Sequence, residues 1–184
     1  MKQQQRRHRL ILGLLALGLL AGVALTAGPA QAVDAVGPYY AEPSWDQKKA
    51  AANRFVVLTN WNSAAVLDKE TGLVWEKAPT GTGPWLQALG QCIVKNVGGR
   101  KGWRLPSIQE LASLVDATQV SPALPLGHPF TVLSAVYWSA TTIAEDPTLA
   151  WVVNVGNGDV FPHGKSTVSY PVWCVRGGMS VEPH

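Results

Sequence analysis

Four basic residues that lie close together near the middle of the chain are the first candidates for binding chemistry. They are Lys95, Arg100, Lys101 and Arg104. Ammonium and guanidinium groups gathered in one place bind anions, because their N–H groups donate to sulfate or carboxylate oxygens. Arg104 also fits a structural role, since a clamp to Glu110 or to a strand carbonyl would satisfy a buried guanidinium. We favour the clamp for Arg104 and keep the anion-binding cluster as the alternative.

Tryptophan is the second residue type that indicates binding, because aromatic rings stack on sugar faces and anchor protein interfaces. All eight tryptophans of the 184-residue chain follow residue 32. We expect core positions for those that lie in strands or beside helix starts, namely Trp103, Trp138, Trp151 and Trp173. Exposure is expected near loops and element starts, at Trp45, Trp61 and Trp85, of which we take Trp61 and Trp85 as ligand candidates.

The sequence shows no pattern typical of catalysis, of a metal site or of a cofactor. His128 and His163 are far apart, and neither has a second ligand at the spacing of a metal site. A nucleophile elbow and a glycine-rich phosphate loop are missing. We therefore predict a non-catalytic protein without metal or cofactor. The alternative is an enzyme that acts on envelope polysaccharide, because two carboxylates distant in the sequence can meet in the fold.

Residues 1–32 have the organisation of a signal peptide. Basic residues precede Leu10, an uncharged apolar run follows, and Ala30 and Ala32 provide the small residues of a cleavage site. We expect cleavage between Ala32 and Val33, export to the periplasm or the exterior, and membrane contact only through this segment before cleavage. An uncleaved anchor is the alternative, because the apolar run is barely long enough for a bilayer core of about 30 Å.

Cleavage would reverse the sign of the net charge. The whole chain has 15 Lys and Arg, 12 Asp and Glu and a formal charge of +3, but four of the basic residues and none of the acidic ones lie in 1–32. Residues 33–184 therefore carry a charge of −1, which gives no reason to expect nucleic acid as a partner. We expect a flexible, proline-containing lead-in over 33–53 and one domain over 54–184.

Cys92 and Cys174 are the two cysteines of the chain, and both lie in the part expected to be exported. An oxidising compartment favours a disulfide, so we predict a bridge between them. A free nucleophile or a cysteine metal pair is the alternative.

Two short helices are expected to position these residues. Pro84 should begin the first, because helical spacing after it produces one apolar stripe of Trp85, Ala88, Leu89 and Cys92. Ser107 and Glu110 have the spacing of a capping box, which predicts a second helix over 108–116.

Alternating and β-branched residues predict the strands. The expected strand regions are 55–58, a hairpin over 64–78 with its turn at 68–72, 135–142, a hairpin over 149–163 with its turn at Asn157-Gly158, and 170–178.

Several segments, in this order, resemble one family: "TGLVWEKA", "WLQALGQC", "GWRLPSIQEL", "YWSATT", "AWVVNVGNGDV" and "VWCVRGG". They are similar to the C-terminal domain of the bacterial collagen-like adhesin Lcl, and the similarity covers about 66–178. The resemblance implies a compact α+β, C-type-lectin-like domain, related also to sulfatase-modifying-factor folds, with a twisted antiparallel sheet and two short helices.

The resemblance also implies a function. In the adhesin, this domain is associated with trimerisation and with binding of sulfated glycans. The present chain has no collagen-like repeat, and its expected mature charge is close to zero. We expect an exported binding module whose partners are glycans or another envelope protein and which self-associates. Two alternatives to a binding module remain. One is the enzyme that acts on envelope polysaccharide, and the other is a structural or oligomerisation domain.

Overall fold

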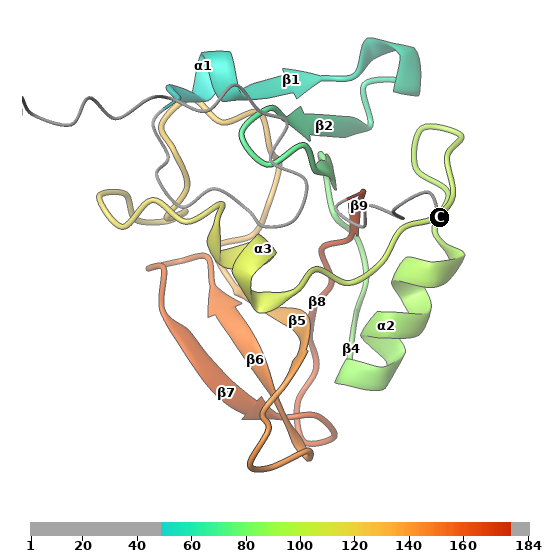
Figure 1. Cartoon of the computed structure of the whole chain (residues 1–184), viewed down its shortest axis with the longest axis vertical. Coiled ribbons are helices and arrows are strands. Elements are labelled where there is room, and N and C mark those ends of the chain that lie inside the picture. The colour runs from blue at the N-terminus through green and yellow to red at the C-terminus, as the bar shows by residue number, and fades with distance from the viewer. Residues whose placement is uncertain (1–48, 178–184) are drawn as a thin grey trace, which may run out of the picture. The chain divides into compact units, whose positions relative to one another are not determined.

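The computed structural model describes residues 49–177, which form an α+β arrangement as expected (Figure 1). The helices are α1 (Ala51–Arg54), α2 (Trp85–Val94) and α3 (Ile108–Ala112), with one 3-10 turn, η1 (Thr59–Trp61). The strands are β1 (Phe55–Val57), β2 (Ala65–Asp68), β3 (Val74–Glu76), β4 (Thr82–Gly83), β5 (Val136–Thr142), β6 (Leu149–Asn154), β7 (Val160–Gly164), β8 (Tyr170–Pro171) and β9 (Val175–Arg176). The expected signal peptide, its cleavage at Ala32 and Val33, and Trp45 lie outside the described residues. None of the helices within 49–177 has the length and apolar character needed to cross a bilayer.

Within residues 49–177 the strands form three antiparallel sheets, so the expectation of a single sheet was wrong. The sheets have the orders β1-β2-β3-β9, β4-β8 and β5-β6-β7. The division arises in the region 170–178, which we expected to be one strand. Its first part pairs with β4 and its last part with β3, and between them the N–H of Cys174 donates to the side chain of Glu76 at 2.8 Å rather than to a strand carbonyl.

Local turn chemistry places both hairpins where the sequence predicts them. Gly72 has a φ of +72°, and the N–H of Glu70 donates to Oδ1 of Asp68 at 2.9 Å, so the chain reverses tightly between β2 and β3. Gly158 has a φ of +86° in the turn between β6 and β7. Both positions require the left-handed backbone that glycine adopts most readily.

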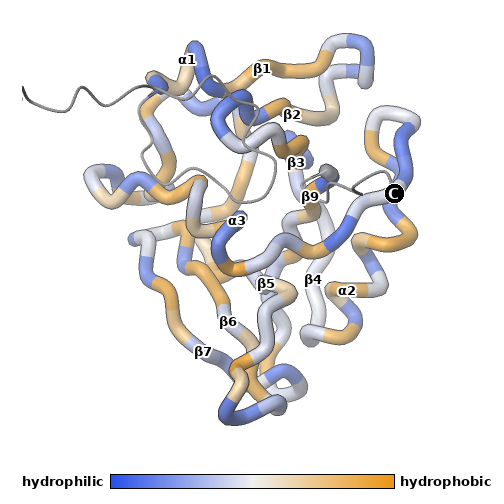
Figure 2. The backbone as a smooth tube through the Cα atoms, in the orientation of Figure 1, coloured by the Kyte–Doolittle hydropathy of each residue, from blue (hydrophilic) through white to orange (hydrophobic). Residues whose placement is uncertain are grey.

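Aromatic side chains occupy much of the core. Trp103, Trp138 and Trp173 are buried as expected, whereas Trp151 is half-buried. Trp173 packs edge-on against Trp75 with 5.5 Å between ring centroids. Figure 2 shows hydrophobic residues recurring along β1, β6 and α2.

The predicted disulfide is confirmed. Cys92 of α2 and Cys174, just before β9, are joined with their Cα atoms 5.5 Å apart. Both cysteines are fully buried. The bridge closes a loop with a sequence separation of 82, which stabilises the fold by about 4 to 5 kcal/mol in the chain-entropy description. It also fixes α2 against the segment that links β8 to β9.

A buried ion pair that the sequence analysis missed anchors the start of the fold. The guanidinium of Arg54 donates from Nε and Nη2 to the two Asp68 carboxylate oxygens at 2.9 and 2.8 Å, and Nη2 also donates to the Ser113 carbonyl at 2.9 Å. The sequence analysis placed Asp68 only at the start of the expected turn at 68–72. Because α1 begins at Ala51 and Ala51 is buried, the last residues of the expected lead-in 33–53 pack as part of the domain.

Arg104 has the clamp geometry that we favoured. Its Nη1 and Nη2 donate to Oε2 and Oε1 of Glu110 at 2.7 and 2.5 Å, and Nη2 also donates to the Gly177 carbonyl at 2.7 Å. The same carboxylate completes the predicted capping box with Ser107 at the start of α3. The helix ends at Ala112, earlier than the 116 that we expected.

We predict that Arg104→Ala lowers the free energy of unfolding by about 1 to 3 kcal/mol, because the largely buried Glu110 loses its charged partner. Arg104→Lys should lose less, since it keeps the charge but not the two-pronged contact. Denaturant unfolding measures both variants. The exposed Arg100 provides a control, since Arg100→Ala should change stability by less than about 0.5 kcal/mol. An unfolding curve for Arg104→Ala equal to that of the wild type would refute the clamp.

Candidate functional site

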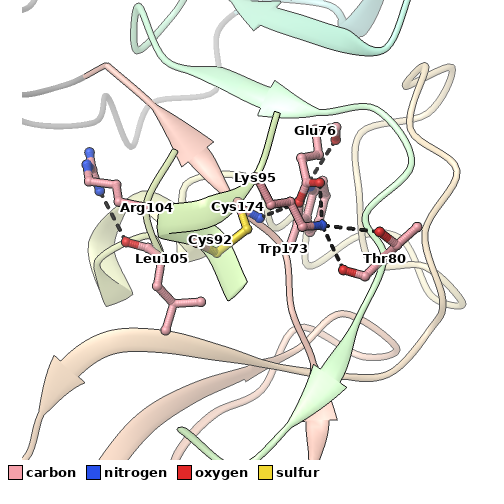
Figure 3. Close-up of a disulfide and its surroundings, with 8 residues drawn as sticks. All are labelled: Glu76, Thr80, Cys92, Lys95, Arg104, Leu105, Trp173 and Cys174. Carbon is pink, nitrogen blue, oxygen red and sulfur yellow. Dashed lines mark hydrogen bonds and ion pairs between the residues drawn. A yellow bond between two sulfur atoms is a disulfide. The ribbon is translucent and has the colours of Figure 1, made fainter. Parts of the chain in front are cut away.

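The structure separates the four basic residues that we grouped as a ligand-binding cluster. The Nζ of Lys95, just after α2, donates to Glu76 Oε1 at 2.6 Å, to the Thr80 carbonyl at 2.7 Å and to Thr80 Oγ1 at 3.2 Å (Figure 3). These contacts use all three protons of the ammonium group. Arg104 is engaged by Glu110. Two of the four residues therefore hold the fold together, while Arg100 and Lys101 are exposed.

Arg100 and Lys101 belong to a different grouping, the tryptophan–arginine surface, which we define as Trp61, Arg100, Lys101 and Arg176. The guanidinium carbons of Arg100 and Arg176 lie 5.5 and 5.4 Å from the centre of the Trp61 ring. Arg176 also donates from Nε to the Lys101 carbonyl at 2.9 Å, which orients its side chain. One indole ring, half-buried, thus has two guanidinium groups beside it, an arrangement favoured by cation–π attraction.

A tight turn brings the basic loop against Trp61. Backbone hydrogen bonds in both directions join Val97 and Arg100, at 3.1 and 3.0 Å. Gly98 within this turn has a φ of +60°, and a Cβ there would lie 2.5 Å from the Trp61 carbonyl oxygen. Only glycine fits this approach. The β-bridge between Arg104 and Val175 then places β9, and with it Arg176, beside the same loop.

The tryptophan–arginine surface keeps its positive charge. Within residues 49–177, carboxylates lie at ion-pair distance from Arg54, Lys95 and Arg104. The structure shows no such carboxylate for the three cations of the surface in that part of the chain. Exposed cations next to an aromatic ring can accept an anionic group on a ligand without first breaking an internal ion pair.

A hollow of about 450 Å³ lies beside this surface. Val97 and Gly98 line the hollow, and Gly98 also lies against the backbone of Trp61. Hydroxyl, amide and ammonium groups contribute much of its lining. The lining residues are Ser63, Ala64, Glu76, Lys77, Ala78, Thr80, Lys95, Asn96, Val97, Gly98 and Thr131. A hollow of this volume lies in the range of small-molecule sites, and its polar groups suit a ligand rich in hydroxyls.

Glu76 is the only carboxylate among the described residues that line the hollow. Burial raises the pKa of Glu76 above 4.5, and the hydrogen bond from Lys95 and the N–H of Cys174 oppose this rise only in part. Hydrolysis of a glycosidic bond usually needs two carboxylates flanking the bond, so this hollow lacks the arrangement that the alternative enzyme would use. The sequence analysis did not single out Glu76. The alternation of residues along β3 indicates which face of the strand a side chain occupies, but not which groups pack against it.

Trp85 lies away from the tryptophan–arginine surface. It begins α2, whereas Lys95 follows its end, and a helix of this length separates them by about 15 Å. The Nζ of Lys165 lies 4.0 Å from the centre of the Trp85 ring, and the indole N–H donates to the Ser139 carbonyl at 2.8 Å. Lys165 itself donates to Thr142 Oγ1 at 2.8 Å. Trp85 is thus built into the fold by contacts that the sequence did not indicate.

The two described histidines that we considered as metal ligands make local contacts. The Nδ1 of His128 accepts from the N–H of Phe130 at 3.2 Å, and burial lowers the pKa of His128. The Nδ1 of His163 accepts from the N–H of Gly164 at 3.0 Å. Residues 49–177 contain no group of three or more His, Cys, Asp or Glu side chains placed to hold a metal ion.

We predict that Glu76 changes the pH dependence of stability. Because its pKa is raised on folding, its contribution is greatest below the unfolded value of about 4.5 and declines as the pH rises through the folded value. The free energy of unfolding of the wild type, minus that of Glu76→Gln, should therefore decrease as the pH rises above the unfolded pKa value. Denaturant unfolding at a series of pH values measures the difference. A wild-type advantage that grows with pH would mean that the Lys95 ion pair outweighs burial.

Comparisons with known proteins agree with the resemblance of the sequence motifs. No curated protein sequence matches this chain. The family model described as the Lcl C-terminal domain matches residues 64–176, which include the tryptophan–arginine surface except Trp61, the hollow except Ser63, and both cysteines. The match covers more than half of the chain. The protein therefore belongs to the Lcl C-terminal domain family.

Proposed function

We propose that this protein is an exported, non-catalytic binding module that recognises acidic glycans through the tryptophan–arginine surface and the adjoining hollow. The observation that carries the proposal is the grouping of the Trp61 ring with Arg100, Lys101 and Arg176. No carboxylate within residues 49–177 neutralises these three cations.

The chemistry of these groups suits a sugar that carries a negative charge. An indole ring packs against the apolar C–H face of a pyranose, and a guanidinium donates two parallel hydrogen bonds to a carboxylate or sulfate. Arg176 is held in place by its hydrogen bond to the Lys101 carbonyl, which reduces the side-chain entropy lost on binding. The hydroxyl and amide groups of the hollow supply further hydrogen-bond partners for sugar hydroxyls.

Family and compartment support the same proposal. The Lcl C-terminal domain is an adhesin-like domain, and adhesins bind extracellular ligands. A buried disulfide suits an oxidising compartment, which is where a signal peptide would deliver the protein. We also propose that the protein is periplasmic or secreted and that its fold is related to that of C-type lectins. The single carboxylate of the hollow favours binding over hydrolysis.

We expect Lys101→Glu and Arg100→Glu each to weaken binding to a sulfated polysaccharide or a polyuronate by about tenfold or more, because each replaces an attraction with a repulsion. Binding of the wild type should decrease with added salt, since exposed charges are screened. Calorimetry or biolayer interferometry with heparin, polygalacturonate and neutral dextran measures both effects.

Lys69→Glu is the matched control, because Lys69 is exposed in the turn between β2 and β3 and the charge change is the same. It should reduce affinity much less than Lys101→Glu. Equal losses for the two variants would indicate a general charge effect and contradict the assigned surface. Absence of binding to every acidic polysaccharide by the folded wild type would reject acidic glycans as ligands.

A further inference from the structure

The ion pair between Glu76 and Lys95 lies in the wall of the hollow. Their side chains are 3% and 13% exposed, and Nζ of Lys95 lies 2.6 Å from Oε1 of Glu76. Both residues line the hollow together with Thr80, to which Lys95 also donates (Figure 3). A ligand in the hollow therefore meets an ammonium group whose charge is cancelled by a neighbouring carboxylate.

The net charge of the hollow depends on whether Glu76 carries a proton. The charged residues of the described lining are Glu76, Lys77 and Lys95, so the lining has one net positive charge when Glu76 is ionised and two when it is protonated. The other described groups in hydrogen-bond or cross-strand contact with Glu76 are uncharged. They are Ala65 on β2, and Trp173 and Cys174 in the link from β8 to β9. Within residues 49–177, Lys95 is thus the one charged group in direct contact with this carboxylate.

The surroundings of Glu76 favour uptake of a proton. Burial raises the pKa of Glu76 above 4.5, because the protein interior stabilises the carboxylate less than water does. A neutral carboxylic acid attracts an ammonium group much less than a carboxylate does. When Glu76 is protonated, Lys95 keeps its contacts with the Thr80 carbonyl and hydroxyl at 2.7 and 3.2 Å. Its charge is then held at the wall of the hollow and is available to a ligand.

We propose that protonation of Glu76 releases Lys95 to bind the ligand, so that the protein holds acidic glycans more strongly at acidic pH than at neutral pH. This inference rests on the proposed function, because it requires the acidic ligand to reach the hollow. The coupling is reciprocal: if the proton strengthens binding, the bound anion must strengthen proton binding by Glu76 by the same factor. Glycan binding and proton uptake are then two measures of one interaction.

The affinity of the purified wild type for dextran sulfate tests the proposal over a series of pH values from about 8 down to about 4.5. Sulfate esters remain ionised throughout this range, so the charge of the ligand is constant. The ionic strength is also held constant, because added salt screens the attraction. Biolayer interferometry should show a dissociation constant about fivefold lower, or more, at the acidic end. Near-ultraviolet circular dichroism establishes that the protein is folded at each pH.

Glu76→Gln separates the effect of this carboxyl from that of the histidines. Glutamine is uncharged at every pH and keeps an oxygen that can accept from the N–H of Cys174. The variant should bind dextran sulfate about fivefold more tightly than the wild type at about pH 8, and the two affinities should converge as the pH falls. Histidine protonation affects both proteins and cancels in their ratio. Glu145→Gln is the matched control, because Glu145 is exposed between β5 and β6, and its affinity should follow that of the wild type.

A second measurement needs no variant and therefore does not depend on the folding of Glu76→Gln. In wild-type protein labelled with carbon-13, NMR follows the carboxyl carbon of Glu76 as the pH is changed. Addition of a short sulfated oligosaccharide should move the titration of Glu76 to higher pH, because the bound anion favours the protonated form. The carboxyl carbon of Glu145 should titrate at the same pH with and without the oligosaccharide.

Two results would overturn the coupling while leaving glycan binding intact. One is a ratio of affinities between Glu76→Gln and the wild type that is the same at every pH. The other is a titration of Glu76 that the bound oligosaccharide does not change. If the folded wild type binds neither dextran sulfate nor the oligosaccharide at any pH, the proposed function itself is rejected for sulfated ligands, and the coupling is rejected with it.

Discussion

The buried carboxylate of Glu76 fixes the segment on which the rest of the structure depends. One of its oxygens accepts from the N–H of Cys174 and the other from Lys95, while its backbone carbonyl accepts from the indole of Trp173. The disulfide to Cys92 holds the same segment from the side of α2. The link from β8 to β9 is thus tied to β3 and to α2 at once. Together with the pairing of β9 with β3 and the bridge between Arg104 and Val175, these ties fix the positions of β9 and of the end of α2.

The same network decides which cations remain available to a ligand. Lys95 neutralises Glu76, and Arg104 neutralises Glu110, so both contribute to the fold. Lys95 and Arg104 fix the two ends of the intervening loop. Arg100, which belongs to this loop, therefore lies beside the ring of Trp61. Internal ion pairing therefore does more than stabilise. It leaves Arg100, Lys101 and Arg176, which have no carboxylate at ion-pair distance within residues 49–177, together on one aromatic surface.

The amino-acid sequence by itself determined the features that depend on neighbouring residues. The capping box of Ser107 and Glu110, the glycine turns at Gly72 and Gly158 and the inner stripe of α2 follow from local backbone chemistry and helical spacing. The two cysteines could be paired because they are the only ones and because the segment before them has the organisation of an export signal.

Only the tertiary structure decided where the polar partners meet. Arg54 joins Asp68 across 14 positions, Lys95 joins Glu76 across 19, and Glu76 joins Cys174 across 98. Periodicity shows which face of an element a residue occupies, but it contains no information on which distant element will pack there. A charged side chain in a single sequence therefore looks the same whether it will be buried in an ion pair or left for a ligand, and only the folded environment distinguishes the two.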